Sequence, residues 1–182
     1  IDLDLANSPN NPDPRSIIHI CQLSKKSALI EPSCFGKTGR EFKKQMPISQ
    51  PRASNSDLVV TTLGTGTPVY NPLRCSQSIL VEAANFFLLF DTGRGVAQRL
   101  VQAGIAPAQI DSLFFTHYHS DHTVGFADFW LGSWLPAGGG RSKPLKVAGP
   151  IGVQALIDGH HIAFADDIRM RVADQKLPLE GT

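Results

Sequence analysis

The chain has 182 residues, of which 42% are hydrophobic, so a single domain with a sizeable core is expected. Seventeen basic and sixteen acidic residues give a formal net charge of +1, which offers no broad electrostatic footprint for nucleic acid but leaves room for a local basic patch. No apolar run approaches the roughly 18 residues of a membrane-spanning helix, and the first residues lack the pattern of a signal peptide.

The amino-acid composition of the chain changes near residue 57. Residues 1–56 are rich in Pro, Asn, Ser and Lys and contain only short apolar islands, so we expect a largely irregular leader or linker. Residues 57–182 are expected to form the folded part.

Strands and helices alternate after residue 57. The β-branched and apolar runs predict strands at residues 58–63, 78–83, 86–90, 110–115 and 145–148. The periodic segments and their glycine and proline boundaries predict helices at residues 95–103, from residue 126 to a break at Pro136, and after Pro150. This order predicts a layered α/β sandwich, with a hairpin joining the second and third strands.

Three imidazoles and one carboxylate follow the strand at 110–115 within six positions: His117, His119, Asp121 and His122. On an extended backbone, side chains two apart point the same way, so His117 and His119 are expected to bind one metal ion together. Asp121 and His122 are then free to face a second ion. This donor set suits a pair of zinc-like ions bridged by a water, which would supply hydroxide near neutral pH. The alternative is a solvated loop without function.

Residues 117–122 match the HxHxDH motif of the metallo-β-lactamase superfamily of dinuclear metal hydrolases, and the chain resembles that family over about residues 57–182. Four further segments support the resemblance: residues 63–68 (LGTGTP), 89–93 (LFDTG), 114–116 (FFT) and 143–150 (KPLKVAGP). Together they look most like the branch that contains the tRNA 3′-end endonucleases and the zinc-dependent arylsulfatase-like enzymes. The segment 167–181 looks more like the arylsulfatase-like members.

The resemblance implies an αββα fold, in which two β-sheets are flanked by helices, with only the first half present in this chain. It also implies two zinc ions per complete domain. The third histidine of the first site, a bridging aspartate and the final histidine of the second site are expected beyond residue 182. His160 and His161 are the only later histidines, and adjacent helical residues diverge by about 100°, so joint binding of one ion by this pair is not expected.

Other residues are candidates for roles around the metals. The resemblance implies that Asp91 lies behind the site, where a buried acceptor would orient a ligating imidazole; an ordinary turn aspartate is the alternative. Asp121 is assigned metal coordination first and proton handling, a catalytic role, second. Arg74 would meet an anionic substrate, although a plain surface arginine is equally open. Trp130 and Trp134 are four apart on a helix, which favours core packing over substrate stacking.

The leading hypothesis is a zinc-dependent hydrolase that acts on a small-molecule sulfate or phosphate ester, as an arylsulfatase or phosphodiesterase does. A tRNA 3′-processing endonuclease is the alternative, less favoured because of the near-zero charge, so nucleic acid is the second choice of partner. A hypothesis of another class is an incomplete, catalytically inert zinc-binding fragment, and the isolated chain is expected to be inactive. No membrane partner is expected. A homodimer and the compartment, periplasmic, secreted or cytoplasmic, stay open.

Overall fold

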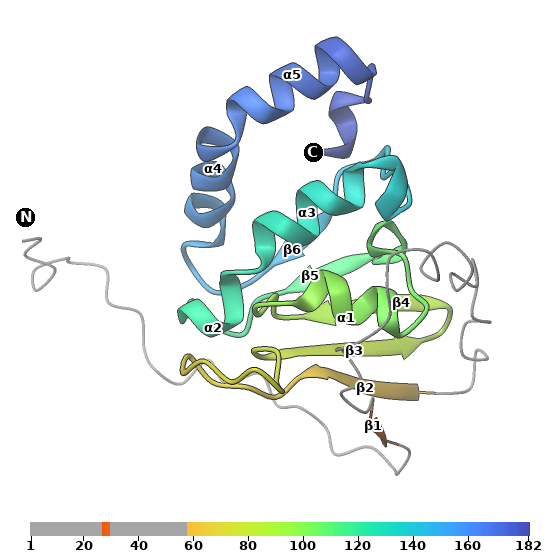
Figure 1. Ribbon diagram of the computed structural model, residues 1–182, viewed down its shortest axis with the longest axis vertical. Helices are drawn as coiled ribbons and strands as arrows, with labels where there is room; N and C mark the ends of the chain where they lie inside the picture. The colour runs from red at the N-terminus through yellow and green to blue at the C-terminus, as the bar shows by residue number, and fades with distance from the viewer. Residues whose placement is uncertain (1–26, 30–57) are drawn as a thin grey trace, which may run out of the picture.

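The computed structural model describes residues 27–29 and 58–182, and its centre is one six-stranded sheet (Figure 1). The strands lie in chain order: β1 (Ser27–Leu29), β2 (Leu58–Gly64), β3 (Ser78–Ala83), β4 (Phe86–Phe90), β5 (Ser112–Phe114) and β6 (Lys146–Ala148). The middle strands β2, β3 and β4 are antiparallel, whereas β1 pairs with β2, and β4, β5 and β6 pair with one another, in parallel. Five of these strands match the predicted runs to within three residues at either end.

The region 1–56 is described only at β1, which is a short strand where a largely irregular segment was expected. The rest of that region lies outside the described residues, and the boundary at residue 57 therefore stays a prediction.

The hairpin between β3 and β4 closes through two residues in the left-handed region. Ala84 has φ of 47° and Asn85 has φ of 68°, and Ala83 pairs directly with Phe86. Two-residue loops with positive φ at both positions match the right-handed twist of the strands that they join. The predicted hairpin is confirmed, with its turn at the predicted residues.

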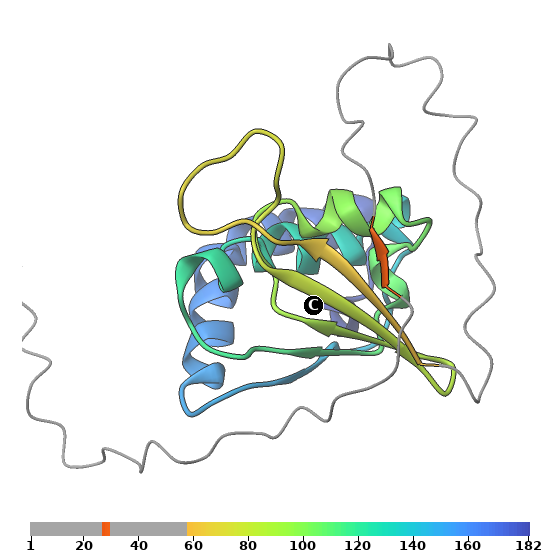
Figure 2. The ribbon, with the colours of Figure 1, turned by 90° about the horizontal axis from the view of Figure 1, so that it is seen from below.

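The helices follow the strands: α1 (Val96–Gln102), α2 (Ser120–Thr123), α3 (Phe126–Trp134), α4 (Val153–Ala163) and α5 (Ala165–Gln175), with short 3₁₀ turns at Pro107–Gln109, Pro136–Gly138 and Leu179–Gly181. Figure 2 shows α1 and α3 on one side of the sheet. No helix among residues 58–182 is long and apolar enough to cross a membrane.

The core lies between the sheet and these helices. Alternate strand residues point toward α1 and α3 and are 0–1% exposed: Leu80, Phe87, Leu89 and Leu113. Trp130 and Trp134 of α3 are 3% and 1% exposed, which confirms the core packing predicted for them. One sheet with helices packed on one face is half of the expected αββα arrangement.

The helix predicted after Pro150 is α4, and a second helix that was not predicted, α5, follows it after Phe164. Helices α4 and α5 arch away from the sheet (Figure 1). Their far end returns to α3, where the Trp134 Nε1–H donates to the Pro178 carbonyl at 2.7 Å. Lys176 has φ of 56° and ends α5 in the left-handed conformation, as is common at helix C-termini.

Candidate metal centre

The cluster forms where two parallel neighbours, β4 and β5, end. Residues of these strands pair from Leu88 with Ser112 to Phe90 with Phe114, so the segments that follow them emerge at the same edge of the sheet. Asp91 follows β4, and the histidine motif follows β5 and continues into the short helix α2. The second half of the motif, which includes Asp121 and His122, is not extended but forms the single helical turn of α2.

The three imidazole rings converge. His117 Nε2 lies 3.0 Å from His119 Nδ1, with ring centroids 4.6 Å apart, and the centroids of His117 and His122 are 4.1 Å apart. Two nitrogens bound to one tetrahedral zinc at 2.0–2.1 Å would be separated by roughly 3.3 Å. The pair His117 and His119 is therefore spaced as joint ligands of one ion would be.

Asp121 and His122 form the other half of the cluster. Asp121 is 5% exposed, and its Oδ1 is buried without a hydrogen-bond partner among the described residues, while Oδ2 lies 3.6 Å from His122 Nε2. A buried carboxylate oxygen without a partner is costly, and a cation removes that cost. The donor set and this unpartnered oxygen fit a divalent metal ion.

Each half supplies a pair of donors and not a full ligand set. Within residues 27–29 and 58–182, no three or more His, Cys, Asp or Glu side chains are arranged to hold one metal ion. A complete centre requires further ligands for each ion.

Asp91 lies behind the histidines and holds the cluster together. Its buried carboxylate accepts the Thr116 backbone N–H and hydroxyl, both at 2.8 Å, and lies 2.7 Å from His122 Nδ1. Asp91 also has φ of 61°, a left-handed conformation that aspartate adopts more readily than most side chains do. The structure thus places Asp91 where a residue that orients a ligating imidazole would lie.

The pKa of His117 is lowered below its ordinary value, first by burial and then by the neighbouring His122 and His119 rings. A lowered pKa keeps the ring neutral at neutral pH. A neutral imidazole has a free nitrogen lone pair, which is the form that binds metals.

Two glycines bring the surrounding loops into close contact. A Cβ at Gly93 would lie 2.5–2.6 Å from backbone atoms of Ser76, Gln77 and Asp121, and one at Gly125 would meet the Thr92 and Gly93 carbonyls. The loop after β2, the loop after β4 and the histidine motif therefore share one tightly packed junction.

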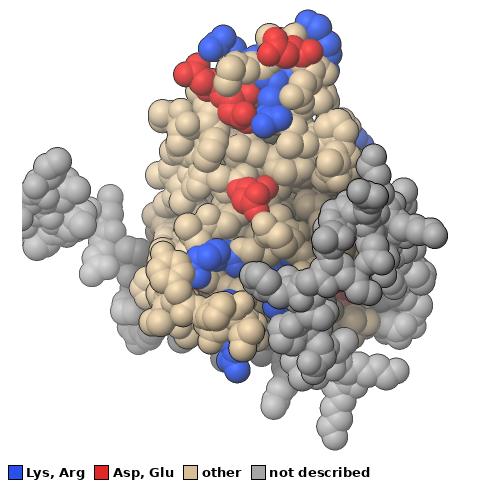
Figure 3. Space-filling view, in the orientation of Figure 1, with Lys and Arg blue, Asp and Glu red and all other residues tan. Residues whose placement is uncertain are grey.

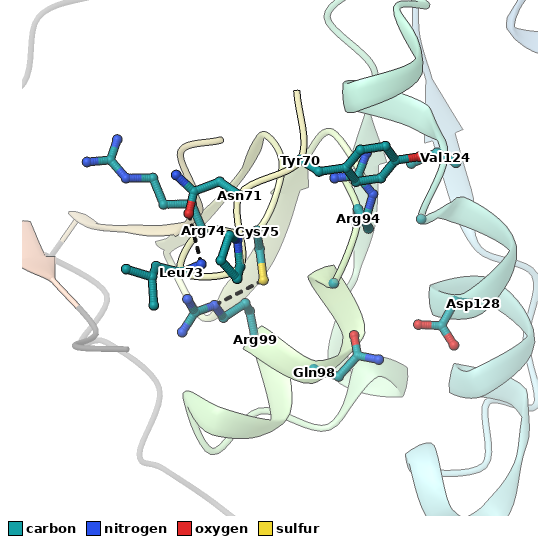
Figure 4. A pocket seen from close by; sticks show the side chains of 13 residues that line it. Tyr70, Asn71, Leu73, Arg74, Cys75, Arg94, Gln98, Arg99, Val124 and Asp128 are labelled. Atoms are coloured by element: carbon teal, nitrogen blue, oxygen red, sulfur yellow. Dashed lines mark hydrogen bonds between the residues drawn. The ribbon is translucent and has the colours of Figure 1, made fainter. Parts of the chain in front are cut away.

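Arg74 does not lie among the histidines but lines a neighbouring pocket of about 740 Å³ (Figure 4). The pocket also contains Arg94, whose guanidinium lies 4.5 Å from the centre of the Tyr70 ring, and the buried Arg99, whose Nε–H donates to Cys75 Sγ at 3.3 Å. Sequence reasoning missed Arg94 and Arg99. The only signal for Arg94 is its place directly after the LFDTG segment.

His160 and His161 of α4 pack on the aromatic side chains of α3. The His160 ring meets Phe126 edge-on at 4.9 Å, and its Nδ1 lies 2.8 Å from the Leu156 carbonyl. The His161 ring meets Trp130 edge-on at 4.7 Å. These contacts give the two histidines a role in docking α4.

Comparisons with known proteins found a matching family model and similar sequences. Residues 58–134 match the sequence model of a family described as anti-Pycsar protein Apyc1. The chain is 39% identical to ribonuclease Z of Mycobacterium marinum over 114 residues and 37% identical to ribonuclease Z of Mycobacterium bovis over 116 residues. These alignments cover 63% and 64% of this chain but 41% of each relative, so the chain spans about two fifths of the length of these relatives.

The fold comparison agrees. Human tRNase Z, short form, superposes with a TM-score of 0.52 at 26% identity and covers 58% of this chain and 40% of the human protein. A long-form RNase Z from yeast gives a TM-score of 0.53 at 16% identity, over 71% of this chain and 20% of the yeast protein, which shows a shared fold alone.

Proposed function

Because the chain belongs to the metallo-β-lactamase superfamily, we propose that it provides the first metal-binding part of a tRNA 3′-processing endonuclease. The similarity to ribonuclease Z and to tRNase Z supports this alternative better than the leading hypothesis from the sequence. The comparisons support the sulfate or phosphate ester of the leading hypothesis only coarsely.

The proposal depends on one observation, the convergence of His117, His119 and His122 with the unpartnered oxygen of Asp121 at one edge of the sheet. His117 and His119 would hold one zinc ion, and Asp121 and His122 a second. Zinc at such a site polarises a phosphoryl oxygen and lowers the pKa of a water to near neutrality.

The side chains around the site contribute orientation and charge. Asp91 holds the His122 ring through Nδ1, which leaves Nε2 to face the site. The carboxylate of Asp121 brings negative charge into a buried position, and this favours a cation over a water molecule there.

The pocket beside the cluster offers a place for an anionic RNA backbone. Three guanidinium groups, those of Arg74, Arg94 and Arg99, line it together with one carboxylate, that of Asp128. The basic patch is local: Figure 3 shows charges of both signs mixed around α5 and a mostly uncharged surface over the rest of that face. A net charge near zero is therefore compatible with contact to a few phosphates.

The test is hydrolysis by the full-length protein that carries this segment, with zinc content measured in parallel. We expect two zinc ions per complete domain and cleavage of a precursor tRNA at its 3′ side, with little turnover of nitrophenyl sulfate. Asp121→Asn should lose most of the activity and part of the zinc, whereas the control His161→Ala, on α4, should retain both.

Two outcomes would contradict the proposal. Turnover of nitrophenyl sulfate with the precursor tRNA left intact would favour the arylsulfatase hypothesis. Fewer than one zinc per chain and no turnover of either substrate would favour an inert zinc-binding fragment.

A further inference from the structure

Thr116 contacts two residues that belong to the proposed metal centre. Its hydroxyl donates to Asp91 Oδ2 at 2.8 Å, and the same oxygen lies 3.0 Å from His117 Nδ1. His122 Nδ1 lies 2.7 Å from the same carboxylate oxygen, Asp91 Oδ2. Asp91 is thus joined to His122 directly and to His117 through one hydroxyl.

The protons in this chain of contacts follow from the chemistry of each group. An ionised carboxylate only accepts hydrogen bonds, so the Thr116 hydroxyl and His122 Nδ1–H must both donate to Asp91. A threonine hydroxyl has one proton, and that proton is committed to Asp91. Toward His117 the hydroxyl oxygen is therefore the acceptor, and His117 must carry its proton on Nδ1.

We propose that Thr116 is a positioning residue that fixes the tautomer of His117. Its hydroxyl donates its only proton to Asp91, so the hydroxyl oxygen can only accept the Nδ1–H of His117. In both His117 and His122 the proton then lies on Nδ1 when the ring is neutral. The unprotonated Nε2 of His117 faces His119, and that of His122 faces Asp121. One carboxylate sets the tautomer of a histidine in each half of the cluster. The inference rests on the proposed function only in treating these nitrogens as metal ligands.

Substitution at position 116 can separate this role from folding. Thr116 is exposed, so Thr116→Val keeps the shape, removes the hydroxyl and should leave the fold intact. The backbone N–H of residue 116 still donates to Asp91 Oδ1 in that variant. Thr116→Ser restores the hydroxyl and is the matched rescue.

The experiment records long-range ¹H–¹⁵N correlation spectra of the imidazoles in the metal-free full chain, near pH 8, where histidines are largely neutral. The His117 signals are identified by their absence in His117→Gln. We expect Nδ1–H tautomers for His117 and His122 in the wild type. In Thr116→Val, His117 should become a mixture of tautomers while His122 stays unchanged. Thr116→Ser should return His117 to the wild-type state.

Zinc affinity, measured by competition with a chromogenic chelator, provides the second readout. Loss of a partner that orients a metal ligand typically weakens metal binding about 10- to 100-fold, and we expect a loss in this range for Thr116→Val and recovery in Thr116→Ser.

Three results would overturn the inference: an unchanged His117 tautomer in Thr116→Val, equal changes in His117 and His122, or no rescue by serine. The tautomer is read without metal or RNA, so a change at His117 together with absent zinc binding would refute the proposed function and leave the role of Thr116 standing.

Discussion

Replacement of Asp91 should reveal two separate contributions, one from its carboxylate and one from its backbone. Asp91→Ala removes the acceptor for the Thr116 N–H and for His122 Nδ1–H. A hydrogen bond to a charged acceptor contributes about 1.5–3 kcal/mol, so the loss of two such bonds lowers the free energy of unfolding by about 3–6 kcal/mol. The Thr116 hydroxyl adds little, because it can turn to water.

The backbone contribution is separated by glycine. At φ of 61° the backbone strain of an alanine is roughly 1–2 kcal/mol, and glycine does not have this strain. Part of the difference is offset because glycine gains more conformational entropy on unfolding. Asp91→Gly should therefore be more stable than Asp91→Ala by about 0.5–1 kcal/mol, although both should be far less stable than the wild type.

Urea denaturation of the full chain measures both effects, and Asp111 provides the control. Asp111 Oδ2 accepts the Phe87 N–H at 2.8 Å, but Asp111 is not among the described residues with positive φ. Asp111→Gly should accordingly be less stable than Asp111→Ala, the reverse of the order at position 91, and zinc binding should be unaffected. The same order at both positions, or an Asp91→Ala variant as stable as the wild type, would refute this reasoning.

Three further predictions concern other parts of the fold. Gly93→Ala should destabilise the chain by several kcal/mol, because the added Cβ would clash with backbone atoms of Ser76, Gln77 and Asp121. Gly132 lies inside α3 with open space around it, so Gly132→Ala should stabilise the chain by roughly 0.5–1 kcal/mol. Thermal melts compare the two variants, and equal shifts of the melting temperature would contradict the packed junction. Because folding lowers the pKa of His117, this ring binds a proton in the unfolded chain at a higher pH than in the folded chain. The free energy of unfolding should therefore fall as the pH drops below about 6.5. Urea titrations should show a smaller fall for His117→Gln. An unchanged pH dependence in that variant would count against the shift. His160→Ala should lose about 1–2 kcal/mol of stability through its contacts with Phe126 and the helix backbone but no zinc affinity, and a loss of zinc would make His160 a ligand instead.

The elements of the fold were readable from local pattern. Apolar alternation bounded by turn residues located five of the strands, and helical spacing placed Trp130 and Trp134 in the core. Helix α5 was not predicted, because it has few apolar residues and buries only one of them, Ile168.

In the candidate site, the donor residues could be predicted from local sequence, but their orientation could not. The types of donor are neighbours in the chain, and a hexapeptide therefore suffices to name His117, His119, Asp121 and His122. Their orientation comes from Asp91, which is 25 residues from Thr116 and 31 from His122. Those contacts exist only because β4 and β5 are parallel neighbours that end at one edge, a pairing that no local pattern encodes. Thr116 illustrates the difference. In the sequence, a threonine before a histidine indicates no function, and its proposed role follows only from the hydrogen bond that its hydroxyl donates to Asp91 at the end of the adjacent strand.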